Sequence, residues 1–325
     1  MNSLPLLTIA IPTYNRNAIV RENVEIILSQ AKAWIRILIL DNCSRTPVAE
    51  TLEGLVDSTA VDVDIHRNPV NVGANANILK CIELCKTPYL WVIGDDDFLA
   101  PGVLDVAYEF IRNEDAIWVN FCSKDIHQPE RLNSVVSGDL RSFLDSLSSI
   151  NELVFISNNI YRTDCIQAGL QLGCLYQSTM APHVVSMIDG VSRVDFSGKF
   201  HLRNEVVFRS ISNNADEETS WPLYQAFIGI NSLYQLPFRN GLRRDVLRLV
   251  RGARHGWLCN RHMFSGMTGL SSAVGKKNAF LTVTGLFASL LVVDGIGVVV
   301  SWPVIAVAIL AGKRITAVFD SIRKK

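Results

Sequence analysis

The chain has 325 residues, of which 49% are apolar and 19% are charged, and its formal net charge is zero. Such a chain can bury a sizeable core, so it is not a disordered tail, and its length suits one large or two modest domains. The charge is uneven, since residues 1–200 carry 15 Lys and Arg against 24 Asp and Glu, whereas residues 201–325 carry 16 against 7. A basic last part of this kind indicates a membrane or a nucleic acid as its partner.

The seven cysteines are scattered, and the closest pair, Cys81 and Cys85, lies within a helical pattern. This spacing predicts neither a zinc site nor a disulfide framework, which fits a reducing compartment. The first residues, MNSLPLL, lack a basic stretch before the apolar run, and that run ends at Pro12. We therefore expect a strand here rather than a signal peptide.

Short apolar runs alternate with segments of helical periodicity along the first 122 residues. We expect strands at 4–11, 35–40, 61–66, 89–93 and 116–121, and helices at 16–30, 48–56, 74–86 and 101–112. Farther on, the pattern predicts a helix at 140–147 and a strand at 155–161 that returns to the sheet. The alternation predicts an α/β fold in which helices flank a mostly parallel sheet, and ligands of such sheets bind at the carboxyl ends of the strands.

Three consecutive aspartates, Asp95, Asp96 and Asp97, follow the strand expected at 89–93. Adjacent carboxylates repel one another, so a shared hard cation with oxygen ligands is the simplest reason to keep them together. The alternative is a solvated acidic turn that precedes the helix beginning near Pro101. The triplet is thus a candidate metal site.

Four polar clusters fall at strand ends or in the loops that follow, at Pro12–Asn15, Asp41–Asn42, Arg67–Gly73 and Asp95–Asp97. No GxGxxG or GxxxxGK[ST] loop is present, which excludes the usual dinucleotide and P-loop sites. A metal held by carboxylates can instead bridge a diphosphate and improve it as a leaving group. Asp41 is suited to accept a hydrogen bond from a nucleobase N–H, so the clusters predict a site for a metal and a nucleoside diphosphate.

Four motifs in order carry a resemblance to a known family: AIPTYNR at 10–16, LILDNCS at 38–44, NVGANAN at 71–77 and WVIGDDDFLAPG at 91–102. The chain resembles the family 2 glycosyltransferases of GT-A fold, and more narrowly the bacterial enzymes that assemble surface polysaccharides such as O-antigen. The resemblance covers roughly residues 4–122. It implies inverting transfer of a hexosyl or deoxyhexosyl group from a nucleotide-diphosphate donor, with Mn²⁺ or Mg²⁺ as cofactor.

The resemblance also implies roles for single residues. The implied nucleotide-binding residues are Pro12, Thr13, Asn15, Asp41, Arg67, Asn71, Asp95 and Asp96. Asp96 and Asp97 are the implied metal ligands, within a DxD-type motif. Many family members have Asp where this chain has Gly94, so which aspartate contacts ribose and which contacts metal is left open.

Inverting transfer needs a base within hydrogen-bond reach of the attacking hydroxyl. The family usually places a carboxylate about 90 residues after the DxD motif, and Asp189 is the nearest match. His183 is a rival, although a lone histidine is more often a structural residue. Asp195 and the cluster Asp216–Glu218 are further candidates, the cluster also being readable as a solvated turn.

Residues 239–278 hold nine Lys and Arg and one acid. From Leu242 to Trp257 the apolar residues share one side of a helical wheel and the arginines the other, as in a helix on an anionic membrane surface. The alternative is an ordinary helix packed on the protein. No aromatic or recognition motif accompanies the arginines, so no nucleic-acid partner is expected.

The segment Ala279–Ala311 contains a single charged residue, Asp294. Positive residues flank it on both sides, which favours two cytoplasmic ends. We therefore expect an apolar, membrane-associated helical hairpin with Asp294-Gly295 near its turn. The alternatives are one tilted span kinked at Pro303 and a buried helix pair used for oligomerisation.

The sequence thus predicts a catalytic domain over 1–238, with a nucleotide-sugar half at 1–122 and an acceptor half at 123–238, and a membrane-association region over 239–325. The expected function is transfer of a sugar to a lipid-linked oligosaccharide at the cytoplasmic face of the bacterial inner membrane. The alternatives are a nucleotidyltransferase with a similar sheet and an inactive membrane-bound scaffold.

Overall fold

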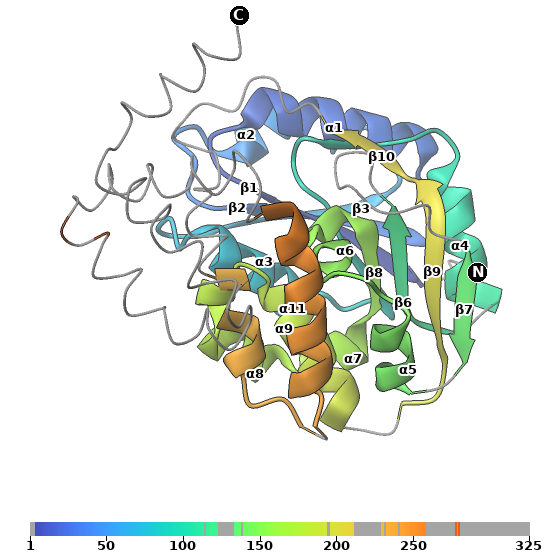
Figure 1. Cartoon of the computed structure of the whole chain (residues 1–325). Helices are drawn as coiled ribbons and strands as arrows, with labels where there is room; N and C mark the ends of the chain where they lie inside the picture. The colour runs from blue at the N-terminus through green and yellow to red at the C-terminus, as the bar shows by residue number, and fades with distance from the viewer. Residues whose placement is uncertain are drawn as a thin grey trace, which may run out of the picture. The chain divides into compact units, whose positions relative to one another are not determined.

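The computed structural model of the chain describes residues 4–113, 115–122, 133–137, 139–193, 196–210, 229–230, 232–239 and 241–257, with Lys277 and Ala279 (Figure 1). The chain forms two compact units. The first comprises Met1–Ser146, Asn151–Gln177 and Pro182–Thr219, and the second comprises Leu147–Ile150, Ser178–Ala181 and Ser220–Lys325. The predicted division near residue 238 stays a prediction.

An eight-stranded sheet with the order β3-β2-β1-β4-β8-β6-β9-β7 forms the centre of the first unit. The strands are β1 (Leu7–Thr13), β2 (Ile35–Asp41), β3 (Asp62–Arg67), β4 (Tyr89–Val92), β6 (Ala116–Cys122), β7 (Ser134–Ser137), β8 (Asn159–Arg162) and β9 (Lys199–Val206). The strands β3, β2, β1 and β4 run parallel, as do β6 and β9, whereas β8 is antiparallel to β4 and β6, and β7 is antiparallel to β9. The expected mostly parallel α/β sheet is confirmed.

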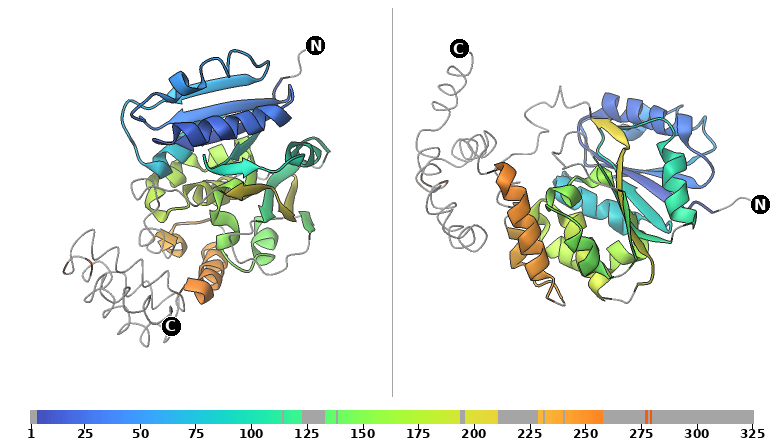
Figure 2. Two further views of the ribbon diagram at one scale, coloured as in Figure 1. Left: turned by 90° about the horizontal axis from the view of Figure 1, so that it is seen from above. Right: turned by 45° about the vertical axis from the view of Figure 1, so that its right-hand side comes forward.

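Helices cover both faces of this sheet, as Figures 1 and 2 show. The helices of the first unit are α1 (Asn17–Gln30), α2 (Val48–Leu52), α3 (Ala74–Leu84), α4 (Val103–Asn113), α5 (Leu140–Asp145), α6 (Asn151–Val154), α7 (Thr163–Ala168), α8 (Leu170–Leu175) and α9 (Pro182–Arg193). The described residues of the whole chain also include the short 3-10 turns η1 (Ile156–Asn158), η2 (Gln177–Thr179) and η4 (Leu233–Gln235).

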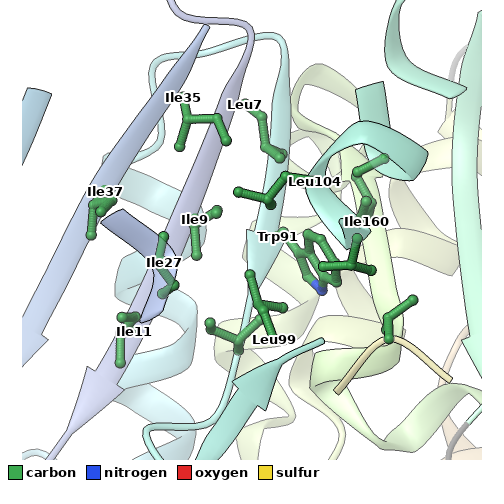
Figure 3. Close-up of a cluster of buried hydrophobic side chains, with 14 of the residues drawn as sticks. Leu7, Ile9, Ile11, Ile27, Ile35, Ile37, Trp91, Leu99, Leu104 and Ile160 are labelled. Atoms are coloured by element: carbon green, nitrogen blue, oxygen red, sulfur yellow. The ribbon is translucent and has the colours of Figure 1, made fainter. Parts of the chain in front are cut away.

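One apolar core lies between the sheet and the helices α1, α2 and α4. Alternate residues of β1, namely Leu7, Ile9 and Ile11, point into it, as expected for a strand whose side chains alternate between faces (Figure 3). Trp91 of β4 and Ile160 of β8 join the same cluster. This packing holds the strands at a fixed register, which in turn fixes where their carboxyl ends lie.

Several elements differ from their predicted bounds in ways that matter for the site. β1 extends to Thr13, past Pro12, so that Thr13 is a strand residue. The strand expected at 155–161 begins only at Asn159, because Ile156–Asn158 is a 3-10 turn. The short antiparallel pair of β5 (Asp97–Leu99) and β10 (Phe208–Ser210) was not expected, and it makes Asp97 the first residue of a strand.

The basic helix predicted near the C-terminus is present in the second unit as α11 (Arg243–Trp257). Its apolar residues Val246, Leu249, Val250 and Ala253 are buried, however, as is Leu242 just before the helix. The segment Leu147–Ile150 packs beside it, since Ile150 N donates to Leu249 O (3.0 Å) and Arg248 Nη1 donates to Leu147 O (2.8 Å). The expectation that this apolar face rests on a membrane is therefore wrong for this structure, because protein already covers it.

Within the described residues, no helix is both long and apolar enough to span a bilayer. Apart from Ala279, the hairpin expected at Ala279–Ala311 lies outside the described residues, as do the candidate acids Asp195 and Asp216–Glu218.

Candidate functional site

The carboxyl ends of the parallel strands bring the predicted polar residues to one edge of the sheet. Thr13 of β1 pairs in register with Asp41 of β2, and Asp41 pairs with Arg67 of β3. Ile93 N donates to Ala10 O (2.9 Å), so the segment after β4 leaves the sheet beside β1. The acidic turn Gly94–Asp97 thus lies at this edge, in the place where ligands of parallel sheets bind.

Arg16, the residue before α1, links two carboxylates of the acidic turn. Its Nη1 lies 2.8 Å from Asp95 Oδ1 and 3.0 Å from Asp96 Oδ2. Thr13 Oγ1 donates to the other oxygen of Asp95 (2.7 Å). Burial raises the pKa of Asp95 above its ordinary value, although Arg16 and Thr13 partly offset this effect. Asp96 is the more accessible of the two, since its side chain is 25% exposed.

Asp97 has different surroundings. Only 4% of it is exposed, and its Oδ2 accepts a hydrogen bond from Ser157 Oγ (2.6 Å). The same hydroxyl accepts from Gly94 N (2.8 Å), which ties the two ends of the turn to η1. A Cβ at position 94 would lie 2.7 Å from Asp97 Oδ2, so glycine leaves room for this inward position. Asp97 is thus held against the protein, whereas the carboxylates of Asp95 and Asp96 share the Arg16 guanidinium; the predicted role of Asp97 as a metal ligand stays a prediction.

A buried asparagine on α1 holds the backbone of the acidic turn. Asn23 Nδ2 lies 3.2 Å from Gly94 O, 3.1 Å from Asp95 O and 3.2 Å from Asp97 O. The Nδ2 group has only two hydrogens for three carbonyl oxygens, so at least one hydrogen is shared between two of these oxygens. The amide thereby fixes the path of the backbone from which the carboxylates project.

We expect Asn23→Ala to lower the free energy of unfolding by about 2 kcal/mol, because buried carbonyls lose their donor. Affinity for a metal and a nucleoside diphosphate should fall in the same variant, since the turn loses its support. Denaturant unfolding and calorimetry measure the two effects. Asn17→Ala, a change at a more exposed asparagine of the same helix that bonds Thr46 O and Thr51 Oγ1, is the control. Equal effects in both variants would argue against the proposed support.

Asp41 is buried, with 1% exposure, and both of its oxygens accept hydrogen bonds. Ser44 N donates to Oδ1 (2.8 Å), while Val48 N (3.2 Å) and Arg67 donate to Oδ2. Burial by itself would raise the pKa of Asp41, but these hydrogen bonds outweigh it and the pKa lies below its ordinary value. In this arrangement Asp41 organises the loop after β2, and its predicted contact with a nucleobase stays a prediction.

Arg67 is held by the loop after β2, and the loop after β3 is held by a group of asparagines. Arg67 Nη2 also donates to Ser44 O (2.7 Å). Asn42 connects the two loops, because it donates to Asn71 Oδ1 (2.8 Å) and accepts from Asn68 Nδ2 (3.0 Å). Asn77 Nδ2 anchors the group to Leu40 O (2.9 Å). The predicted loop residues Arg67 and Asn71 therefore occupy one hydrogen-bonded edge with Asp41.

Asn15 lies in the turn after β1, with a positive φ of 55° that asparagine tolerates better than most residues. Its N donates to Ser44 Oγ (2.9 Å), and its Oδ1 accepts from Arg45 N (2.8 Å). Its buried Nδ2 makes no hydrogen bond in the described part of the chain. Asn15 and Pro12, which is partly exposed, thus belong to the same edge as predicted.

The two candidate bases both lie on α9 and both are 2% exposed. Asp189 Oδ2 accepts from Arg193 Nε (2.6 Å), four residues farther along the helix. His183 Nε2 lies 3.3 Å from Leu153 O, and burial lowers the pKa of His183 to about 4. The histidine is therefore neutral near pH 7, and its Nδ1 has no hydrogen-bond partner among the described residues.

The carboxylate oxygens at this edge suit a metal cation that is also bound by oxygens of the substrate. Among the described residues, no three His, Cys, Asp or Glu side chains gather closely enough to hold a metal ion. Mg²⁺ in nucleotide sites is commonly bound by one or two carboxylates together with phosphate oxygens. Asp95 and Asp96, already joined by one cationic group, fit that pattern.

Comparison with known proteins agrees with the motifs. The model of glycosyl transferase family 2 matches residues 8–149. The abequosyltransferase RfbV of Salmonella typhimurium is 27% identical over 178 residues, which cover 50% of this chain. The chain spans about half the length of that relative, 49%.

Solved structures show the same fold. S. aureus TarS 1-349 in complex with UDP-GlcNAc has a TM-score of 0.58 at 11% identity, covering 82% of this chain and 80% of that one. The mannosyltransferase PcManGT from Pyrobaculum calidifontis, in complex with GDP-Man and Mn²⁺, has a TM-score of 0.52 at 11% identity, covering 95% and 86%. The GT-A type of fold expected from the sequence is thereby confirmed, and the match to the glycosyl transferase family 2 model covers somewhat less than half of the chain.

Proposed function

We propose that this chain is a glycosyltransferase that moves a hexosyl or deoxyhexosyl group from a nucleotide-diphosphate donor to a lipid-linked oligosaccharide. The observation that carries the proposal is the acidic turn at the carboxyl edge of the sheet, where one cationic group joins Asp95 and Asp96. The family 2 domain and the similarity to an abequosyltransferase support it. Among the described residues, each predicted donor-side residue lies at this edge.

The residues proposed to bind the nucleotide-sugar donor have different roles. Asp41, Arg67 and Asn71 shape the pocket for the nucleoside, and Thr13 orients Asp95 toward the ribose. Asp96, together with Asp95 or Asp97, would hold a divalent cation, Mn²⁺ or Mg²⁺, which neutralises the diphosphate and makes it a better leaving group. Because Asp97 is bonded to Ser157, we favour Asp95 as the partner of Asp96.

On the acceptor side, the proposed base is His183 or Asp189. A base must be unprotonated and must have a free lone pair near the acceptor hydroxyl. His183 is unprotonated, and its Nδ1 retains a lone pair, but its pKa of about 4 makes it a weak base. Asp189 shares one oxygen with Arg193 and keeps lone pairs on the other. Both residues therefore stay candidates, and either has to become accessible when the acceptor binds.

Calorimetry discriminates this function from an inactive scaffold. UDP, CDP, GDP and dTDP are titrated into the full chain with and without Mn²⁺ or Mg²⁺. A glycosyltransferase should bind at least one of them more tightly when the metal is present. Absence of binding by all four, with and without metal, would favour the scaffold.

We further propose that the apolar segment Ala279–Ala311 attaches the enzyme to the cytoplasmic face of the bacterial inner membrane as a hairpin. A segment of 33 residues with a single charge binds a bilayer more firmly than one amphipathic helix does. The basic flanks would stay on the cytoplasmic side. This location would bring the active site close to a membrane-bound acceptor.

Truncation after Lys277 is expected to give a protein that binds nucleotide normally but transfers sugar to a lipid-linked acceptor far more slowly. Transfer to a short water-soluble acceptor analogue, the internal control, should change much less. Membrane pelleting, nucleotide affinity and turnover on both acceptors are compared with those of the full chain. If the truncated protein still pellets with membranes, the hairpin is not the main anchor. If it loses nucleotide binding, the segment belongs to the protein's own core.

A further inference from the structure

Arg16 places a positive charge of the protein itself between two carboxylates of the proposed metal site. A single nitrogen, Nη1, donates to Asp95 Oδ1 at 2.8 Å and to Asp96 Oδ2 at 3.0 Å. The arginine side chain is 15% exposed and that of Asp95 is 9% exposed, so water screens this contact only partly. The contact is therefore an ion pair in a partly dehydrated place, which is stronger than one on the open surface.

A metal that binds both oxygens competes with this guanidinium. Divalent cations of this class lie about 2.0–2.6 Å from their oxygen ligands. Any such position is within about 5.5 Å of Nη1, because Nη1 is itself within hydrogen-bond distance of the same oxygens. A divalent ion and a guanidinium that close together repel each other and share the same lone pairs. Metal binding through these two oxygens is therefore favoured when Arg16 leaves them.

The carboxylates need a positive charge in the absence of metal. Asp95 is buried, and its two oxygens accept from Arg16 Nη1 and from Thr13 Oγ1. The carboxylate of Asp96 lies beside it and accepts from the same guanidinium. Arg16 therefore offsets the repulsion between the two carboxylates and holds them in place until a metal arrives.

We propose that Arg16 makes metal binding depend on the nucleotide: it occupies the Asp95–Asp96 pair in the free protein and transfers to the diphosphate when the donor binds. The inference rests on the proposed function, since it requires a donor diphosphate at this edge. Guanidinium groups bind phosphate oxygens well, often through two parallel hydrogen bonds. A diphosphate therefore offers Arg16 an anionic partner in exchange for the carboxylates, which the metal then takes.

Such an exchange links the two ligands. The nucleoside diphosphate raises the affinity for the metal by releasing the carboxylates, and by thermodynamic reciprocity the metal raises the affinity for the nucleotide by the same factor. Arg16 is thus a positioning residue that contacts either the Asp95–Asp96 pair or the diphosphate. Without it, the affinity for the metal should depend less on the nucleotide.

The test measures free Mn²⁺ by electron paramagnetic resonance in the full chain and in Arg16→Gln, first with Mn²⁺ alone and then with UDP, CDP, GDP or dTDP. With Mn²⁺ alone, Arg16→Gln should bind the metal about tenfold more tightly than the wild type, because the competing charge is gone. When the nucleotide that the wild type binds is also present, the difference in Mn²⁺ affinity between Arg16→Gln and the wild type should shrink. Arg16→Gln should also bind that nucleotide more weakly than the wild type does.

Arg21→Gln is the matched control, because it removes a positive charge from the helix that follows Arg16, where Arg21 pairs with Glu25; it should leave both affinities unchanged. Arg16→Lys retains the charge, so with Mn²⁺ alone it should resemble the wild type. It should lose part of the coupling between Mn²⁺ affinity and nucleotide affinity. This variant replaces Arg16→Gln in the test if the glutamine variant does not fold. Unchanged or weaker Mn²⁺ binding by Arg16→Gln, in a protein that still binds nucleotide, would overturn the inference. Failure of the wild type to bind any of the four nucleotides would instead overturn the proposed function.

Discussion

Asp96→Asn is expected to lower the rate of sugar transfer at least about a hundredfold. Loss of a residue that only supports a metal ligand already costs about 10–100-fold in many enzymes, and loss of the charged ligand itself should cost more. Asp96 has the more exposed carboxylate of the pair joined by Arg16, so it is the group best placed to reach a metal. The asparagine has the same shape but cannot supply the negative charge.

The measurement is kcat at saturating donor and limiting Mn²⁺, together with the melting temperature. Asp105→Asn is the control, because Asp105 is an exposed carboxylate that pairs with Lys32 on the surface. Asp97→Asn should also lower turnover, since the inward position of Asp97 supports the turn. Turnover near that of the wild type in Asp96→Asn, even at limiting metal, would end the assignment of the acidic turn as the metal site.

Asp41→Ala is expected to lower the free energy of unfolding by about 3 kcal/mol and to weaken nucleotide binding by about 1–3 kcal/mol. The carboxylate is buried and accepts from two backbone N–H groups and from Arg67. Its removal leaves these donors without a partner at the edge of the proposed nucleotide pocket. Asp64→Ala, which removes the partly exposed partner of Arg36 on the neighbouring strand, should cost less than about 1 kcal/mol.

The pH dependence gives a second check on Asp41. Its pKa is lowered in the folded protein from the ordinary 3.8, so the folded state favours the charged form. The stabilisation is therefore fully present above the unfolded pKa and is lost as the pH falls through the lower, folded pKa. Denaturant unfolding of the wild type and of Asp41→Asn should give the largest difference at neutral pH and converging values in the acid range. A difference that grows toward low pH would contradict the stated role.

Much of the fold followed from local patterns in the sequence. The runs at 35–40 and 89–93 are short, apolar and bounded by turn residues, and they form β2 and β4 almost as expected. The four motifs share one edge because parallel strands end together, so topology alone predicted that Thr13, Asp41 and Arg67 would meet. These features depend on residues close in sequence and on a general property of parallel sheets.

The side-chain contacts within the site depend on distant residues, which local patterns do not encode. Arg16 and Asp95 are far apart in the chain, and only the packing of α1 against the sheet brings them together. Asn23 did leave a signal, because it is a polar residue within the buried stripe of α1 beside Val20, Val24 and Ile27. A helical wheel of residues 17–30 would have identified it as a buried amide in need of partners.

The basic helix shows the opposite case, in which the pattern was correct and its interpretation was not. An amphipathic wheel indicates one face to be buried but does not say what buries it. In α11 the covering residues include Leu147–Ile150, about a hundred positions earlier in the chain. The glycine at position 252 fits the same contact, because a Cβ there would lie 2.0 Å from Ser148 O and would clash with it.

The most direct test of the proposed function identifies the product released from a nucleotide sugar. The full chain is incubated with a panel of nucleotide sugars, a lipid-linked acceptor and Mn²⁺ or Mg²⁺, and the released compounds are separated by chromatography. We predict that one donor releases its nucleoside diphosphate, that the release needs the metal, and that Asp96→Asn abolishes it. A parallel incubation contains a nucleoside triphosphate and a sugar phosphate. Formation of inorganic diphosphate there, without release of nucleoside diphosphate from any nucleotide sugar, would show a nucleotidyltransferase and would contradict the proposal.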